Sequence, residues 1–143
     1  KELRIVNILN TDVEACGGTH LDSTIEAEKI KILKSNKISD SIVRIEFVAG
    51  KKALEEENKE KLILEETSKL LNCEISQIPG RVEELFNLWK DIVKKNKKIP
   101  FRLTSTKKST EDILVETSSI LKTPPENIIK TITRFLKEVN DKK

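Results

Sequence analysis

The sequence predicts an α+β fold, in which a short β-rich N-terminal segment precedes a mainly α-helical module of about four helices. Over residues 1–50 apolar residues alternate with polar ones, a period typical of half-buried strands. After Gly50 the apolar spacing changes to the three and four residues typical of amphipathic helices. The length of 143 residues suits one ordinary domain or two small ones and is too short for a complete multi-step enzyme.

Three apolar-leaning runs predict strands in residues 1–50. They are residues 3–9, residues 30–32 and residues 43–47, in which Val43, Ile45 and Phe47 alternate with Arg44 and Glu46. Turn-forming residues are concentrated at 10–12, 21–24 and 36–40. We therefore expect a meander of strands with loops.

Residues 51–143 predict helices. Residues 52–71 carry Glu/Lys pairs at i,i+4 spacing, as in a long solvated helix. Residues 81–95 place Val82, Leu85, Phe86, Trp89, Ile92 and Val93 on one face behind Pro79-Gly80. Residues 97–108 predict a connector with an extended segment. One more helix is predicted over residues 110–122 and another from Pro124-Pro125 onward.

The helical part contains an internal echo at an offset of 50 residues. Glu66-Thr67-Ser68 with Leu71 matches Glu116-Thr117-Ser118 with Leu121, and Ile78 matches Ile128. Val82 then matches Ile132, and Leu85-Phe86 matches Phe135-Leu136. Two related helical hairpins, 52–95 and 109–141, would explain the echo; the alternative is chance resemblance between amphipathic helix pairs.

Composition excludes several classes of protein. Apolar and charged residues each make up 36% of the chain, as in a folded and strongly solvated protein. No apolar run approaches the roughly 20 residues that span a bilayer, and the first residues lack a signal-peptide core, so we expect no membrane and a cytoplasmic location. The two cysteines, Cys16 and Cys73, do not indicate a disulfide framework. The chain begins with Lys1 rather than Met, so we expect it to be cut from something longer.

Positive charge is concentrated between residues 90 and 108, where Asp91 is the one acidic residue. The eight basic residues are Lys90, Lys94, Lys95, Lys97, Lys98, Arg102, Lys107 and Lys108. Such a cluster either solvates a helix face or contacts a polyanion, and contact with a nucleic-acid backbone would be salt-sensitive and would carry no sequence information.

Cys16-Gly17-Gly18-Thr19-His20 is the one motif that brings a thiol close to an imidazole, and His20 is the sole histidine. Thiolate and imidazole are good zinc ligands, and the two glycines allow a tight backbone path between them. Two ligands do not complete a tetrahedral site. An incidental glycine turn and a Cys–His nucleophile pair are the alternatives, although no residue that would orient the imidazole is evident.

The motif lies in a segment that resembles the second additional domain of alanyl-tRNA synthetases, which threonyl-tRNA synthetases and free-standing editing proteins share. The resemblance covers residues 1–50, through residues 12–20, 24–26, 31–34 and 43–47. Residues 82–90 resemble the helix after the editing domain in archaeal-type alanyl-tRNA synthetases. One departure is Glu28, where the family usually has Gly.

The resemblance implies an editing role, the hydrolysis of tRNA(Ala) mischarged with serine or glycine. The family's zinc is held by a His-x3-His pair, which this chain lacks, and by a Cys-x3-His element that maps to Cys16 and His20. Gly17, Gly18 and Thr19 would shape the pocket wall. ATP would be used by an aminoacylation core that lies outside this chain.

We therefore interpret the chain as a C-terminal part of an archaeal-type alanine–tRNA ligase. Residues 1–50 would be the end of the editing domain, and residues 51–143 a region for tRNA(Ala) binding and homodimerisation. The intact parent would ligate alanine to tRNA and edit it, and this segment alone is expected to be inactive. The alternative is a non-catalytic dimerisation and tRNA-binding module with a vestigial metal motif; a free-standing editing protein would leave the helical half without a role.

Overall fold

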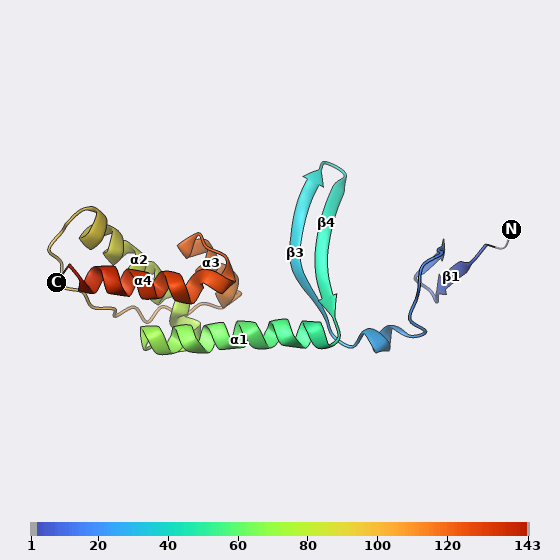
Figure 1. Ribbon diagram of the computed structural model, residues 1–143, viewed down its shortest axis with the longest axis horizontal. Helices are drawn as coiled ribbons and strands as arrows, with labels where there is room; N and C mark the ends of the chain where they lie inside the picture. Colours follow the sequence, from blue (N-terminus) through green and yellow to red (C-terminus); the bar gives the residue numbers. More distant parts are fainter. Residues whose placement is uncertain (1–2, 143) are drawn as a thin grey trace. The chain divides into compact units, whose positions relative to one another are not determined.

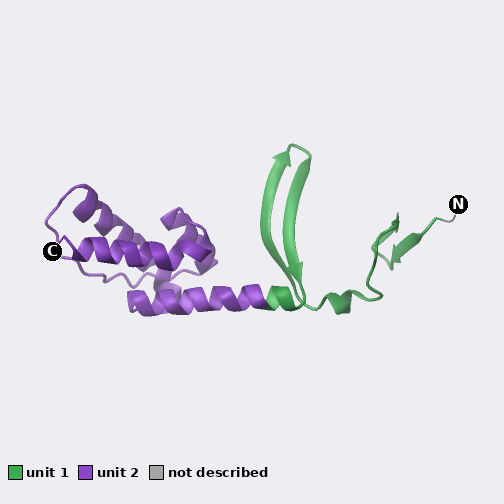
Figure 2. Ribbon diagram, viewed as in Figure 1, with its two compact units in different colours: residues 1–54 green, residues 55–143 purple. Residues whose placement is uncertain are grey.

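The computed structural model describes residues 3–142, which divide into two compact units, Lys1–Leu54 and Glu55–Lys143 (Figure 2). The strands all lie in the first unit, and the second unit is built from helices and one long connector. The predicted α+β class is confirmed. No helix in residues 3–142 is both long enough and apolar enough to cross a membrane.

The first unit begins with a short antiparallel hairpin of β1 (Ile5–Ile8) and β2 (Asp12–Ala15). The turn between them places Asn10 at φ 59°, a left-handed conformation that Asn tolerates well. Strand β2 was not predicted, because the alternation in Asp12-Val13-Glu14-Ala15 extends over only four residues and Asp12 belongs to the predicted turn at residues 10–12.

A longer antiparallel hairpin pairs β3 (Ile30–Ser39) with β4 (Ile42–Ala49), and Asp40 and Ser41 form its turn (Figure 1). The predicted turn over residues 36–40 is therefore largely wrong, since β3 continues to Ser39. Lys37 Nζ contacts Asp40 Oδ1 at 2.7 Å across the end of the hairpin. Two irregularities in the register, near Ile32/Lys34 and Lys37/Ser39, interrupt the ladder.

The apolar residues of this hairpin are exposed rather than half-buried. Ile32, Val43, Ile45 and Phe47 are 55–63% exposed. A ribbon of two strands covers neither of its own faces, so period-two alternation creates an apolar face without supplying anything to bury it. The expectation of half-buried strands is therefore wrong for the described residues.

Four helices follow the hairpins (Figure 1): α1 (Lys51–Leu71), α2 (Ile78–Trp89), α3 (Ile113–Leu121) and α4 (Ile128–Asn140). The 3₁₀ turns Ile75–Gln77 and Pro125–Asn127 precede α2 and α4, and a π-helical turn, Lys90–Lys94, ends α2. Helix α2 begins before Pro79-Gly80 rather than after it, because proline is tolerated in the first turn, where its missing N–H has no partner to lose.

The helical unit packs around one apolar core. The fully buried members come from all four helices: Leu71, Ile78, Val82, Leu85, Leu114, Leu121, Ile128, Ile132 and Phe135. Trp89 stacks on Phe135 with ring centroids 4.4 Å apart, and its indole N–H donates to Glu138 Oε2 at 2.6 Å. The face of α2 predicted from residues 82–93 therefore forms core, with Trp89 joining α2 to α4.

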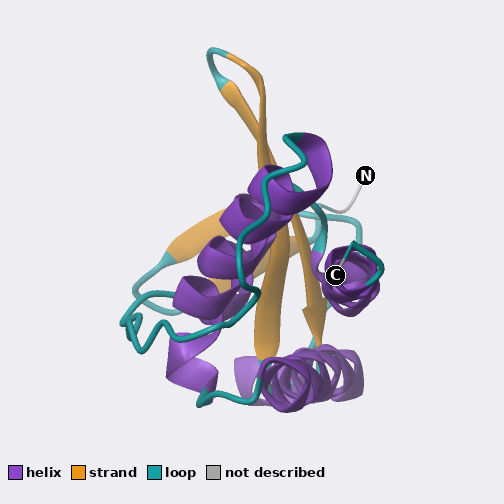
Figure 3. Ribbon diagram, turned by 90° about the vertical axis from the view of Figure 1, so that its left-hand side faces the viewer, coloured by secondary structure: helices purple, strands orange, loops and turns teal. Residues whose placement is uncertain are grey.

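The connector between the π-helical turn and α3 has no regular structure over residues 96–110 (Figure 3). The carboxylate of Glu84 holds it against α2: the backbone N–H groups of Thr104 and Ser105 donate to it at 2.8–2.9 Å. Burial alone would raise the pKa of Glu84, but these donors and the Thr104 hydroxyl outweigh it and hold the pKa below its ordinary value. The side chain of Glu84 thus makes three of the hydrogen bonds that fix the predicted extended segment to α2 through Thr104 and Ser105.

Candidate functional site

The loop from Cys16 to His20 is fastened to the first strand. The Cys16 N–H donates to the Arg4 carbonyl at 3.2 Å, which extends the β1–β2 pairing by one step. The Arg4 guanidinium in turn donates from Nη1 to the Gly18 carbonyl at 2.9 Å. Both ends of the Cys16–Gly18 turn are therefore held by the same residue.

Gly18 lies between the side chains of Cys16 and His20. A Cβ atom built on Gly18 would be 3.5 Å from Cys16 Sγ and 3.9 Å from His20 Nε2. The Gly18 N–H also donates to Cys16 Sγ at 3.5 Å. The turn therefore places the sulfur and the imidazole nitrogen both within van der Waals distance of the Cβ position of residue 18.

These donors fit two positions of a tetrahedral zinc site. Cys16 is half-buried and His20 is exposed, so both can be reached from outside the unit. In residues 3–142 no further His, Cys, Asp or Glu joins them in a group of three that could hold a metal ion. Gly17 has open space around its Cβ position, and Thr19 is exposed, so the predicted pocket wall faces outward.

Glu28 occupies a backbone conformation that normally requires glycine. Its φ of 54° and ψ of −111° lie in a region where a Cβ atom is strained. The carbonyl groups on either side of Glu28 nonetheless hold this turn to Gly50, because the Gly50 N–H donates to the carbonyls of Ala27 and Lys29 at 3.0 and 2.8 Å. The chain therefore keeps the turn but places an unfavourable residue in it.

Other candidate side chains have structural roles. Glu26 accepts the Ser23 N–H at 2.8 Å and closes the capping box of the 3₁₀ helix Thr24–Ala27. Cys73 packs against the helical core, and burial raises the pKa of its thiol. Neither takes part in a group of titratable side chains that could perform acid–base chemistry.

Half of the basic cluster between residues 90 and 108 is paired with carboxylates. Lys95 and Lys97 contact Asp91 at 2.8 and 3.2 Å, Lys107 contacts Glu83 at 3.7 Å and Lys108 contacts Glu74 at 2.8 Å. Counting charges along the sequence missed the last two partners, because helix α2 and the turn before it bring them to the connector from about 25 to 35 residues away.

The other members of the cluster are more available. Lys90 Nζ lies 3.9 Å from the Phe86 ring centroid, and Lys94 Nζ lies 5.0 Å from that of Trp89. Within residues 3–142 neither Lys98 nor Arg102 makes an ion pair. The cluster therefore divides into a paired part, Lys95, Lys97, Lys107 and Lys108, and a cationic part without ion pairs in residues 3–142, Lys90, Lys94, Lys98 and Arg102. Both parts extend from the end of α2 into the connector.

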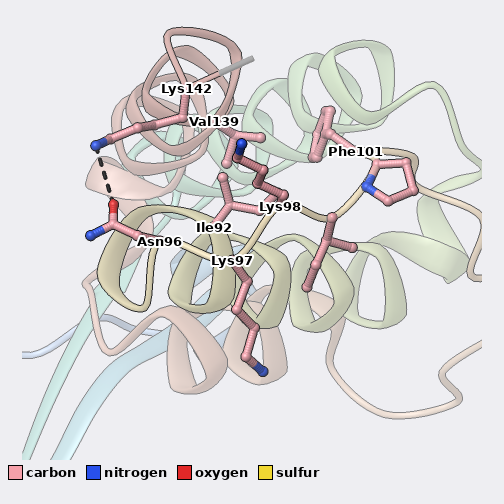
Figure 4. Close-up of a pocket in the computed structure, with 9 residues that line it drawn as sticks. Ile92, Asn96, Lys97, Lys98, Phe101, Val139 and Lys142 are labelled. Carbon is pink, nitrogen blue, oxygen red and sulfur yellow. Dashed lines mark hydrogen bonds between the residues drawn. The ribbon is translucent and has the colours of Figure 1, made fainter.

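A cavity of about 560 Å³ opens beside this cationic part, between the ends of α2 and α4 (Figure 4). Lys97 and Lys98 line it together with Lys142, whose Nζ donates to Asn96 Oδ1 at 3.3 Å. Ile92, Phe101 and Val139 supply its apolar wall. Lys142 was not predicted to lie here, because it is 46 residues from Asn96 along the chain and only the fold brings the two together.

A second cationic groove, of about 550 Å³, lies where α3 turns into α4. It is lined by Leu121, Lys122, Thr123, Asn127, Lys130, Thr131 and Arg134. No carboxylate is among these residues. This groove was not predicted from the sequence, because its cations are spaced too widely to form a run of positive charge. The i,i+4 spacing of Lys130 and Arg134 is the signal that could have identified one face of the groove.

Comparison with known proteins identifies relatives of both units. Residues 3–46 match the family model described as the threonyl and alanyl tRNA synthetase second additional domain. The chain is 42% identical over 97 residues to the alanine–tRNA ligase of Pyrococcus furiosus, covering 68% of this chain and 11% of that protein. It is 42% identical over 103 residues to that of Methanocella arvoryzae, covering 72% of this chain and 12% of that protein.

The alanine–tRNA ligase of Methanococcoides burtonii aligns with 98% of this chain at 31% identity, and the alignment covers 16% of that protein. This chain thus spans 11–16% of the length of these three relatives. No solved structure matches the chain. On these matches the chain belongs to the alanine–tRNA ligase family, with residues 3–46 as its second additional domain segment.

Proposed function

We propose that the chain is a working part of an alanine–tRNA ligase, in which residues 3–50 contribute half of an editing site for mischarged Ser- or Gly-tRNA(Ala). The observation that carries this proposal is the convergence of Cys16 Sγ and His20 Nε2 on Gly18, within the segment that matches the second additional domain. If the motif were vestigial, nothing would require glycine at position 18, between the Cys16 thiol and the His20 imidazole.

Cys16 and His20 would hold one zinc ion together with ligands outside this chain. When bound, zinc supplies Lewis-acid chemistry and orients a substrate ester and water. The chain's own residues prepare the site: Gly18 leaves room at the ligands, and Arg4 fixes the Gly18 carbonyl, so that the turn keeps its shape. Gly17 and Thr19 border the approach from solvent.

The helical unit would bind tRNA(Ala) by its exposed cations. Lys98 and Arg102 carry uncompensated charge, and Lys90 and Lys94 lie over aromatic rings with their ammonium groups exposed to the surroundings. Contacts of this kind neutralise phosphates and release counterions, so binding would weaken steeply with salt. The paired lysines, Lys95, Lys97, Lys107 and Lys108, would contribute less, since each must leave a carboxylate first.

The same unit would support a homodimer. Helix α1 leaves Leu62 64% exposed, and α3 leaves Val115 63% exposed, the two highest values among the exposed large apolar side chains described in this unit. Exposed apolar side chains on helices are common at self-association surfaces. The remainder of the synthetase, with the ATP-dependent aminoacylation core, is the further partner, and the cytoplasm is the compartment in which tRNA charging takes place.

The proposal is tested by the release of serine from Ser-tRNA(Ala), measured with this chain alone and after addition of a segment that carries the His-x3-His pair, with zinc present. Hydrolysis in the mixture and not with either piece alone supports a divided editing site. If both pieces are folded and the mixture is inactive, the rival account, a tRNA-binding and dimerisation module, is the better one.

A further inference from the structure

The two halves of the helical unit match position by position at an offset of 50 residues. The first half is α1–turn–α2 and the second is α3–turn–α4, and both Ile78 and Ile128 begin a helix after a 3₁₀ turn. Asn72 and Lys122, at the ends of α1 and α3, both have positive φ, at 48° and 52°. Buried core residues occur in equivalent pairs: Leu71 with Leu121, Ile78 with Ile128, Val82 with Ile132 and Leu85 with Phe135.

In the first half, one face of α2 is covered by the connector. Glu84 accepts the N–H groups of Thr104 and Ser105, and the Ser109 N–H donates to the Ser76 carbonyl at 2.8 Å. Gly80 lies directly under the connector: an added Cβ would be 3.0 Å from Lys107 Cβ and the Lys107 carbonyl oxygen. This face of α2 therefore binds an extended chain. The Glu84 carboxylate accepts hydrogen bonds from the backbone of that chain, and Gly80 leaves room for the chain to approach the helix.

The equivalent face of α4 is open. Position 80 is buried whereas its counterpart, Lys130, is exposed; position 84 is half-buried whereas its counterpart, Arg134, is exposed. The groove that lies here is lined only by residues of 121–134 in the described part of the chain. The same architecture thus presents a place for an extended segment with nothing in it from residues 3–142.

The chemistry of this face is inverted relative to α2. Glu84, which accepts hydrogen bonds, is replaced by Arg134, which donates them, and Gly80 and Asn72 are replaced by Lys130 and Lys122. Thr123, Asn127 and Thr131 add uncharged donors. Arg134 has one long contact with a carboxylate, 3.9 Å from Nε to Glu138 Oε1, and its side chain remains 59% exposed.

We propose that this α3–α4 groove binds an extended sugar–phosphate backbone of RNA, with Lys122, Lys130 and Arg134 as its phosphate contacts. The inference deepens the proposed tRNA-binding role and rests on it. An extended polypeptide requires acceptors for its N–H groups, as Glu84 shows, and the groove has none among its charged side chains. The phosphate oxygens of an RNA backbone are anionic acceptors that recur along an extended chain, which suits a groove with three cationic donors.

The experiment measures binding of the whole chain to a tRNA(Ala) transcript by fluorescence anisotropy over a series of salt concentrations. The groove variant is Lys130→Gln/Arg134→Gln, and the matched control is Lys61→Gln/Lys69→Gln on α1, which removes the same charge from exposed positions elsewhere in the helical unit. We expect the groove variant to bind about tenfold more weakly and its salt slope to fall by about 1.5, while the control changes little. Far-UV circular dichroism verifies that both variants stay folded.

Each outcome is informative. Equal losses in the two variants, or no loss in the groove variant, would overturn the groove assignment while leaving tRNA binding intact. Failure of the unaltered chain to bind the transcript would instead overturn the tRNA-binding part of the proposed function, and with it this inference. A poly-glutamate peptide that binds as tightly as the transcript and loses affinity in the same groove variant would assign the groove to an acidic polypeptide and contradict RNA.

Discussion

Replacing Glu84 with glutamine tests whether one carboxylate holds the connector to α2. Its oxygens accept the Thr104 N–H at 2.9 Å, the Ser105 N–H at 2.8 Å and the Thr104 hydroxyl at 3.0 Å. Hydrogen bonds to a charged group contribute about 1.5–3 kcal/mol each, but they share one side chain and glutamine keeps one acceptor oxygen. We therefore expect a loss of about 2 kcal/mol in the free energy of unfolding.

The assay is urea unfolding at pH 7, followed by the fluorescence of Trp89, which lies in the same core. A loss of about 2 kcal/mol would lower the melting temperature of a unit of this size by about 8–16 °C. The control is Glu83→Gln, next along the chain, whose contact with Lys107 is 3.7 Å long and well exposed; its expected effect is below about 0.5 kcal/mol. Equal effects of the two substitutions would refute the reasoning.

The pH dependence provides a second check on Glu84. Its pKa in the folded chain lies below the ordinary value of 4.5, so the stabilisation is complete above that value and is lost as the pH falls through the folded pKa. The stability difference between the unaltered chain and Glu84→Gln should therefore be constant near neutral pH and shrink in acid. A difference that grows in acid would contradict the assignment.

Three further substitutions and measurements follow from individual residues. Glu28→Gly should relieve the strain of a φ of 54° by about 1 kcal/mol, seen as about fivefold slower hydrogen exchange of the Gly50 amide; faster exchange would contradict it. Thr117→Val should stabilise the helical unit by about 1 kcal/mol in urea unfolding, because its buried hydroxyl has no hydrogen-bond partner among residues 3–142, and a loss of stability would show that it has one. In a Cys16→Ala background, alkylation of Cys73 should have its pH midpoint above that of the unfolded chain, because burial raises its pKa; identical midpoints would remove that effect.

The helices were predictable because their signals are local. Amphipathic spacing, Pro79 and the pair Pro124-Pro125 all act within a few turns, and the four helices lie close to their predicted ranges. Strand β2 and the length of β3 were not predictable, because strand pairing depends on a partner rather than on the strand's own apolar pattern.

The burial of the strands and the charge of the connector depended on distant residues. Alternation in Val43, Ile45 and Phe47 predicts an apolar face but does not say whether anything covers it. Likewise, Lys107 and Lys108 are cationic in a local count and paired in the fold, because α2 and the turn before it bring Glu83 and Glu74 to them. The proximity of Cys16 and His20 was predictable because they lie four residues apart, and their role as metal ligands stays a prediction. The groove at Lys130 and Arg134 exists only where two helices meet.

The central claim is that Cys16 is a ligand in an editing site rather than an incidental thiol. The most direct measurement compares Cys16→Ala with Cys73→Ala in the full-length ligase that contains this chain, and follows serine release from Ser-tRNA(Ala) beside alanine attachment to tRNA(Ala). We predict that Cys16→Ala abolishes serine release and keeps alanine attachment, while Cys73→Ala keeps both. Serine release that survives in Cys16→Ala at the unaltered rate would contradict the account.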